Sequence, residues 1–266
     1  MLLSSAAICL AEPMTSEAAG DAKNHQVVDN SNLSASGKYL PAKNAKRSPS
    51  ADIEEREGEA TKASSIERLG GGRYRIGKVV LDKVKRTVTL PARVNMTKGV
   101  VEYILVSEDG KSHEAVFTTD ARPSDIHTAC LLLGMKELPL ASWPSDYNGI
   151  ARENRVLVDV SWKGNGPAKK VAASQSVVRA SSGQEAVADQ ACLPSGPWLY
   201  AGSCIEGGLF TADREGSLIS VISDKAALIN GIRPNYDDDT LYEANSKLLP
   251  NVNFKVEFTL TLPIQR

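Results

Sequence analysis

Apolar and polar residues alternate along much of this chain, which is the pattern of β-strands with one buried face. Between residues 74 and 118 the alternation predicts four strands, at 74–81, 88–94, 101–105 and 113–118. The Asp109-Gly110 pair before the last of them tolerates the positive φ angle of a tight hairpin. We therefore expect antiparallel pairing in this region.

One stretch changes to the period of an α-helix. Ile126, Cys130 and Leu133 recur at i, i+4 and i+7 after Pro123, and Gly134 stands where a helix commonly ends. Further alternation predicts strands at 156–162, 198–201, 209–212, 217–222 and 254–262, and short helices are expected at 224–230 and 240–247. The expected fold class is α+β, with mainly antiparallel strands and a few short helices, preceded by a disordered N-terminal segment.

The character of the chain changes at three consecutive glycines, Gly70 to Gly72. Residues 12–72 are rich in Ala, Ser, Asn, Lys and Glu, with almost no aromatic or β-branched clusters. Such a segment cannot bury enough apolar surface to offset the entropy lost on ordering. We therefore expect a disordered linker at 12–72 and one α+β domain at 73–266.

The first eleven residues are apolar or small and end in Cys9-Leu10-Ala11, which resembles the end of a secretory signal. No Lys or Arg precedes Lys23, so we expect that this signal peptide, at 1–11, is truncated and that translation starts further upstream. Lipid anchoring at Cys9 is the less favoured alternative, because bulky Ile8 precedes that cysteine. The expected location is outside the cytoplasm, in the periplasm or the cell envelope.

Charge and hydropathy narrow the class of partner. The chain has 31 basic and 32 acidic residues, so its net charge of −1 gives no field that would attract nucleic acid. No apolar run reaches the length of about 18 residues that a transmembrane helix needs. We expect neither a nucleic-acid partner nor a transmembrane segment.

Three cysteines remain if the signal is removed, namely Cys130, Cys192 and Cys204. The last two flank a short loop rich in Pro and Gly, and an oxidising compartment favours closing it with a disulfide worth about 2–3 kcal/mol. Cys130 lies in the predicted helix and is interpreted as a small core residue. The spacing contains no Cys-x-x-Cys run, which argues against an iron–sulfur cluster.

The densest group of reactive side chains is His113, Glu114, Asp120, Asp125 and His127. Two histidines and a carboxylate can hold a metal or perform acid–base chemistry, so His113, Glu114 and His127 form a candidate metal site. Their spacing matches no helical zinc signature. The favoured interpretation is structural, with His113 and Glu114 beside a turn and Asp125 complementing the helix dipole.

Other motifs carry less chemistry. Nucleotide binding is not expected, because the chain contains neither a complete dinucleotide-binding loop nor a Walker motif. The run 237–239 is three aspartates, but turn and helix capping explains it better than calcium. The segment 117–122 (FTTDAR) is echoed by 210–214 (FTADR), through chance or an old duplication.

Several motifs together resemble one protein family. They are Ile76-Gly77-Lys78-Val79-Val80-Leu81-Asp82, Val94-Asn95-Met96, Gly99-Val100-Val101-Glu102-Tyr103, Gly110-Lys111-Ser112-His113-Glu114 and the helix at 123–134. The region 73–263 is similar to the YdjY-domain family of exported bacterial proteins. This resemblance implies export but supplies no activity.

Two hypotheses for function follow. The first is an exported, non-catalytic module of the cell envelope, structural or binding an envelope protein or small ligand. The second is a metal-binding protein or metal-dependent enzyme centred on His113, Glu114 and His127, with Glu114 as ligand or general base. Catalytic residues are not identified under either hypothesis.

Overall fold

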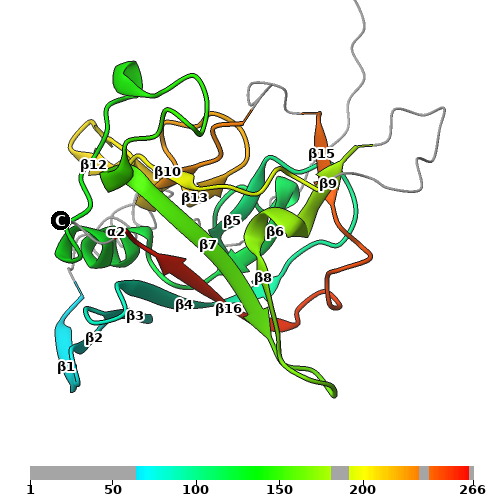
Figure 1. Ribbon diagram of the computed structural model, residues 1–266, viewed down its shortest axis with the longest axis horizontal. Coiled ribbons are helices and arrows are strands. Elements are labelled where there is room, and N and C mark those ends of the chain that lie inside the picture. Colours follow the sequence, from blue (N-terminus) through cyan, green and yellow to red (C-terminus); the bar gives the residue numbers. More distant parts are fainter. Residues whose placement is uncertain (1–63, 181–191, 234–239, 264–266) are drawn as a thin grey trace, which may run out of the picture. The chain divides into compact units, whose positions relative to one another are not determined.

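The computed structural model describes residues 64–180, 192–233 and 240–263 (Figure 1). The predicted signal at 1–11 and most of the predicted linker lie outside these residues. Within them, no helix is both long and apolar enough to cross a membrane.

The described chain begins with an antiparallel meander of four strands, β1 (Ile66–Gly70), β2 (Arg73–Ile76), β3 (Val79–Asp82) and β4 (Thr87–Val94). Alternate side chains of β3 and β4, such as Leu81 and Leu90, are buried. Strand β1 lies within the segment that we predicted to be linker. Its residues are mostly exposed, and its backbone pairing with β2 is what makes it a strand.

Eight strands of the described chain form a closed ring in the order β4-β16-β7-β10-β14-β13-β5-β6, and β6 pairs back with β4 through Arg93↔Thr118 and Val94↔Phe117. The ring strands after β4 are β5 (Tyr103–Ser107), β6 (Ala115–Thr119), β7 (Arg155–Trp162), β10 (Trp198–Tyr200), β13 (Ser217–Ser220), β14 (Ile229–Asn230) and β16 (Lys255–Thr261). Strand β8 (Lys169–Ala172) pairs with β7 outside the ring.

Two short pairs of strands lie apart from this sheet. Strands β11 (Ile205–Glu206) and β12 (Leu209–Phe210) form a hairpin, and β9 (Val177–Arg179) pairs with β15 (Tyr242–Ala244). Single 3₁₀ turns occur at Ser112–Glu114, Leu140–Ser142, Arg152–Asn154 and Ala173–Ser176.

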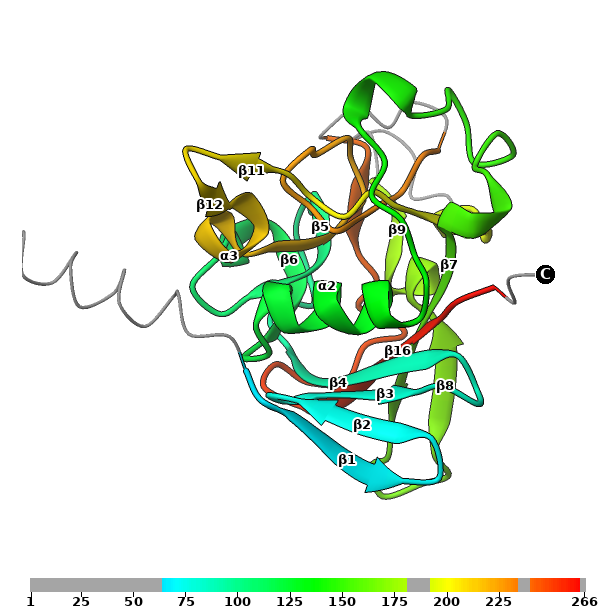
Figure 2. The same ribbon diagram turned by 90° about the vertical axis from the view of Figure 1, so that its left-hand side faces the viewer.

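The two α-helices of the described residues are α2 (Pro123–Leu132) and α3 (Thr211–Glu215). Helix α2 buries Ile126, Ala129 and Cys130, as the period predicted. In Figure 2, α2 lies between the meander below it and α3 with the β11–β12 hairpin above it. The guanidinium of Arg86 lies at the C-terminal end of α2, where it donates to the carbonyl oxygens of Leu133 (2.7 Å) and Pro263 (2.6 Å).

The core is filled by side chains. Phe117 and Phe258 meet edge to face with ring centroids 5.1 Å apart. Next to α2, an apolar void lined by leucines and isoleucines has a volume of only about 10 Å³, too small for more than one water molecule. A ligand therefore has no room in this void, and a binding site has to be sought on the loops.

The α+β fold class is wrong, because the described chain is mostly β and its strands close into a barrel. The segments 224–230 and 240–247, expected to be helices, contain β14 and β15. Residues 229–230 are fully buried in the sheet, and β15 is held by pairing with β9. Tertiary pairing overrides weak local helix signals in both places.

The expected hairpin at Asp109-Gly110 is also wrong, because β5 and β6 pair in parallel, with Leu105 opposite Phe117. The chain turns at Asp109 and passes through the 3₁₀ turn Ser112–Glu114 before it enters β6. Strands β13 and β14 form a second parallel pair, while the other pairings are antiparallel as predicted.

Candidate functional site

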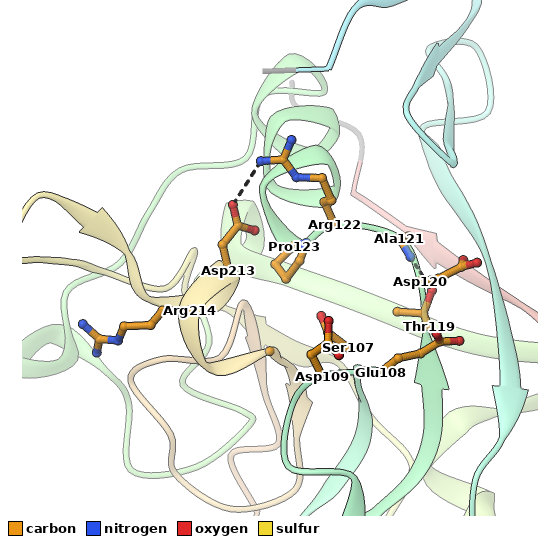
Figure 3. A pocket seen from close by; sticks show the side chains of 11 residues that line it. Ser107, Glu108, Asp109, Thr119, Asp120, Ala121, Arg122, Pro123, Asp213 and Arg214 are labelled. Carbon is orange, nitrogen blue, oxygen red and sulfur yellow. Dashed lines mark hydrogen bonds and ion pairs between the residues drawn. The ribbon is translucent and has the colours of Figure 1, made fainter. Parts of the chain in front are cut away.

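A cleft of about 260 Å³ opens beside the start of α2 (Figure 3). Three segments form it: the turn after β5, the loop from β6 into α2, and α3 with its C-terminal glycine. The lining residues are Ser107, Glu108, Asp109, Thr119, Asp120, Ala121, Arg122, Pro123, Asp213, Arg214 and Gly216. The lining is rich in charge, with four carboxylates and two guanidinium groups.

Two glycines hold two walls of the cleft together. Gly216 ends α3 with a φ angle of +71°, and a Cβ atom on it would lie 2.6 Å from Cα of Gly110. The amide of Ser107 donates to the carbonyl oxygen of Gly216 at 2.8 Å. The turn after β5 and the end of α3 therefore touch backbone to backbone, which fixes the shape of this part of the cleft.

Asp213 joins α3 to the N-terminus of α2. Its carboxylate accepts a hydrogen bond from the amide of Ser124 at 2.8 Å and lies 3.6 Å from the guanidinium of Arg122. A helix N-terminus next to an arginine favours an anion. Because Asp213 already fills this position, as Figure 3 shows, the cleft offers little attraction to an external anion.

Most other charges of the cleft are also paired. Glu108 lies 2.6 Å from Arg93, and Asp120 pairs with Lys78. Arg214 points away from the cleft in Figure 3 and bonds Glu206 and Glu215.

Asp109 is the exception. Its side chain makes no hydrogen bond or ion pair within the ranges that the structure describes, and it is exposed at the tip of the turn after β5. The charge left to interact with a ligand is therefore negative.

His127 lies one turn after Ser124 on α2 and belongs to a small polar network. Its Nε2 is 3.0 Å from the Glu137 carboxylate and its Nδ1 is 2.8 Å from the Tyr200 hydroxyl. Its ring packs on Phe210, with centroids 4.9 Å apart. Burial lowers the pKa of His127, while Glu137 and Asp213 oppose that shift.

The candidate metal site is not assembled. His113 is 78% exposed and lies 3.6 Å from Glu114 alone, whereas His127 is 12% exposed and is bonded to Glu137 and Tyr200. In the described ranges, no group of three or more His, Cys, Asp or Glu side chains could hold a metal ion. His113 belongs to the turn before β6 and His127 to α2, and the fold gives them different partners.

The predicted disulfide is not formed. All three cysteines of the described chain have free thiols. Cys192 is exposed, and its backbone forms an isolated antiparallel β-bridge with Val178. The Cys204 thiol lies 3.4 Å from the Thr211 hydroxyl. Cys130 is buried as predicted, and burial raises the pKa of its thiol to about 12.

The two remaining members of the sequence cluster have separate roles. Asp120 lines the cleft, whereas Asp125 is buried under the turn at Gly77 and accepts a hydrogen bond from Ser64 at 2.9 Å. Asp125 therefore ties α2 to the meander, and the expected contribution to the helix dipole is compatible with this place in the first turn.

Reasoning from the sequence missed Asp109, Arg122 and Asp213 as site residues. One signal could have found two of them, because the echoed segments 117–122 and 210–214 meet at the cleft. Thr119 to Arg122 come from the first copy, and Asp213 and Arg214 from the second. The repeated Asp and Arg residues therefore line one cleft.

These features define a closed, mostly β domain with a charged cleft beside its main helix. The YdjY domain family model matches residues 79–261, so the chain belongs to the YdjY-domain family, as its motifs indicated. Comparisons with curated proteins and with solved structures find no match.

Proposed function

We propose that this protein is an exported, non-catalytic binding module of the cell envelope, and that the cleft beside α2 binds its ligand. The observation that carries the proposal is the cleft itself, about 260 Å³ in volume and lined by charged groups on fixed segments. A space of this size suits one functional group of a ligand or one protein side chain rather than a whole cofactor.

The charges of the lining favour a cationic group. Asp213 occupies the anion position at α2, and Asp109 is left free to pair. A primary amine or a guanidinium placed between Asp109 and Asp213 would gain charge-assisted hydrogen bonds. A lysine or arginine side chain of an envelope protein, or a small amine, is the proposed ligand class.

A titration of the full chain with methylguanidinium, followed by amide NMR shifts, tests the proposal. We expect the amides of Asp109 and Asp213 to shift, with a roughly millimolar dissociation constant for so small a probe. Asp109→Asn should weaken binding about tenfold, the effect of losing about 1.4 kcal/mol from one charge-assisted bond.

Glu153→Gln is the matched control, because Glu153 is an exposed carboxylate outside the cleft. It should leave the affinity unchanged, and acetate should produce no shifts at the cleft. Equal binding of acetate, or full affinity in Asp109→Asn, would contradict the assignment.

Export rests on the sequence alone, on the apolar start that ends in Cys9-Leu10-Ala11. N-terminal sequencing of protein isolated from its native source should give Glu12 as the first residue. Ala11→Leu should block processing, because a bulky residue replaces the small one at the cleavage position. A mature chain that retains residues 1–11 rejects cleavage, and a lipid on Cys9 would favour the anchored alternative.

A further inference from the structure

The side chain of His127, on α2, lies at the contact between α2 and the start of α3. Its ring contacts Phe210, and Phe210 is the residue from which α3 begins. On its own helix, His127 follows Ser124, whose amide is bonded to Asp213 of α3. Two contacts therefore join α2 to α3, and we call them the α2–α3 junction. One is the packing of the His127 imidazole on Phe210, and the other is the hydrogen bond from the Ser124 amide to Asp213 at the cleft.

The neighbours of the imidazole define its protonation state. Glu137, in the loop after α2, accepts from Nε2, so the neutral ring carries its proton there and Nδ1 accepts from the Tyr200 hydroxyl. Asp213 of α3 is close enough for its charge to act on the ring, and β12 presents the apolar ring of Phe210. Every polar position of the neutral ring therefore has a partner.

A second proton on the ring breaks this arrangement. With Nδ1 protonated, both ring nitrogens are donors, and Tyr200 can no longer donate to His127. Tyr200 is fully buried, so its hydroxyl hydrogen would be left without the acceptor that it has now. Glu137 is 61% exposed and can follow a charged ring towards solvent. Turning outwards removes the imidazole from Phe210.

We propose that His127 makes the α2–α3 junction, and through it the binding cleft, sensitive to pH. The junction is closed when His127 is neutral and loosens when it gains a proton. This regulation concerns the cleft of the proposed function, but the change at the junction requires no ligand.

Burial of His127 determines how the stability of the protein changes with pH. Because burial holds the pKa of His127 below its ordinary value of about 6.5, the unfolded chain takes up this proton first as the pH falls. The contribution of neutral His127 to the stability of the folded protein is complete above about pH 6.5, and it is lost as the pH falls towards the lowered pKa of the ring.

The test follows the Ser124 amide and the His127 ring by NMR in the full chain, without ligand, from about pH 8 to pH 5. We expect the amide resonance to shift with the same midpoint as the ring. In His127→Gln that shift should disappear, because glutamine keeps a donor for Glu137 and an acceptor for Tyr200 without titrating. His113→Gln is the matched control and should retain it, because His113 is exposed and lies outside the network.

A ring that titrates while the Ser124 amide stays constant would overturn the proposal, as would a shift that persists in His127→Gln. If that variant does not fold, agreement or disagreement of the two midpoints in the wild-type protein decides the question. Failure of methylguanidinium to bind would remove the proposed function but leave this measurement intact.

Discussion

Gly216→Ala should destabilise the protein by about 2–5 kcal/mol and distort the cleft. About 1–2 kcal/mol comes from placing alanine at the φ angle of +71°, and the remainder from a methyl group 2.6 Å from Cα of Gly110. Neither backbone can move without separating the turn after β5 from α3. Urea unfolding measures the loss of stability, and the Asp109 amide resonance reports the change in the cleft.

Gly208→Ala is the matched control. Gly208 has a φ angle of +81°, but a Cβ atom there would meet no atom within 4 Å. Its variant should lose only the conformational part, about 1–2 kcal/mol. Equal losses in the two variants would mean that the backbones at Gly110 and Gly216 can separate to admit a methyl group at little cost.

Arg233→Ala should cost about 3–5 kcal/mol, because it removes a fully buried charge that organises a loop. The guanidinium donates to the carbonyl oxygens of Pro194 (3.0 Å), Gly196 (3.2 Å) and Pro197 (3.1 Å). It also lies over the rings of Tyr147 and Trp198 at 5.0 and 5.3 Å. Thermal unfolding and the fluorescence of the tryptophans measure the effect.

Two further variants separate the causes. Arg233→Lys keeps the positive charge but lacks the planar guanidinium, whose several N–H groups reach three carbonyl oxygens at once. We therefore expect the lysine variant to be more stable than Arg233→Ala but less stable than the wild-type protein. Arg152→Ala removes an exposed arginine and should change stability by less than about 0.5 kcal/mol. Full stability in Arg233→Lys would show that charge, and not the fork of donors, holds the loop.

The strands were predictable wherever one face is buried along several residues. The alternation at 254–262 and 156–162 predicted β16 and β7, whose inward side chains include Phe258 and Val160. The helix at 123–134 was equally clear, because its buried residues follow one period. Repeated local burial leaves a pattern in the sequence, and these elements are confirmed.

Closure of the ring could not be predicted in the same way. It depends on a short pairing in which Arg93 and Val94 of β4 meet Thr118 and Phe117 of β6. Strands of two or three residues, such as β14 and β15, are too short to display a period. Their state is set by partners distant in sequence, so local propensity gave helices instead.

The site was harder still. The sequence emphasised residues with reactive side chains, such as His113 and His127, but the fold gives these two separate partners. The cleft is built instead from common charged residues, Asp109 and Asp213 among them, whose meeting depends on backbone contact between Gly110 and Gly216. Only the echoed Asp and Arg residues indicated it.

The position of β16 affects when the protein can fold during its synthesis. This strand enters the sheet between β4 and β7, although it is made long after both. Until Thr261 has left the ribosome, β4 and β7 each lack a neighbour, and the ring stays open. Such distant pairing makes folding slow, and the unfinished chain remains unfolded for longer. The ring can therefore close only after almost the whole chain has been made.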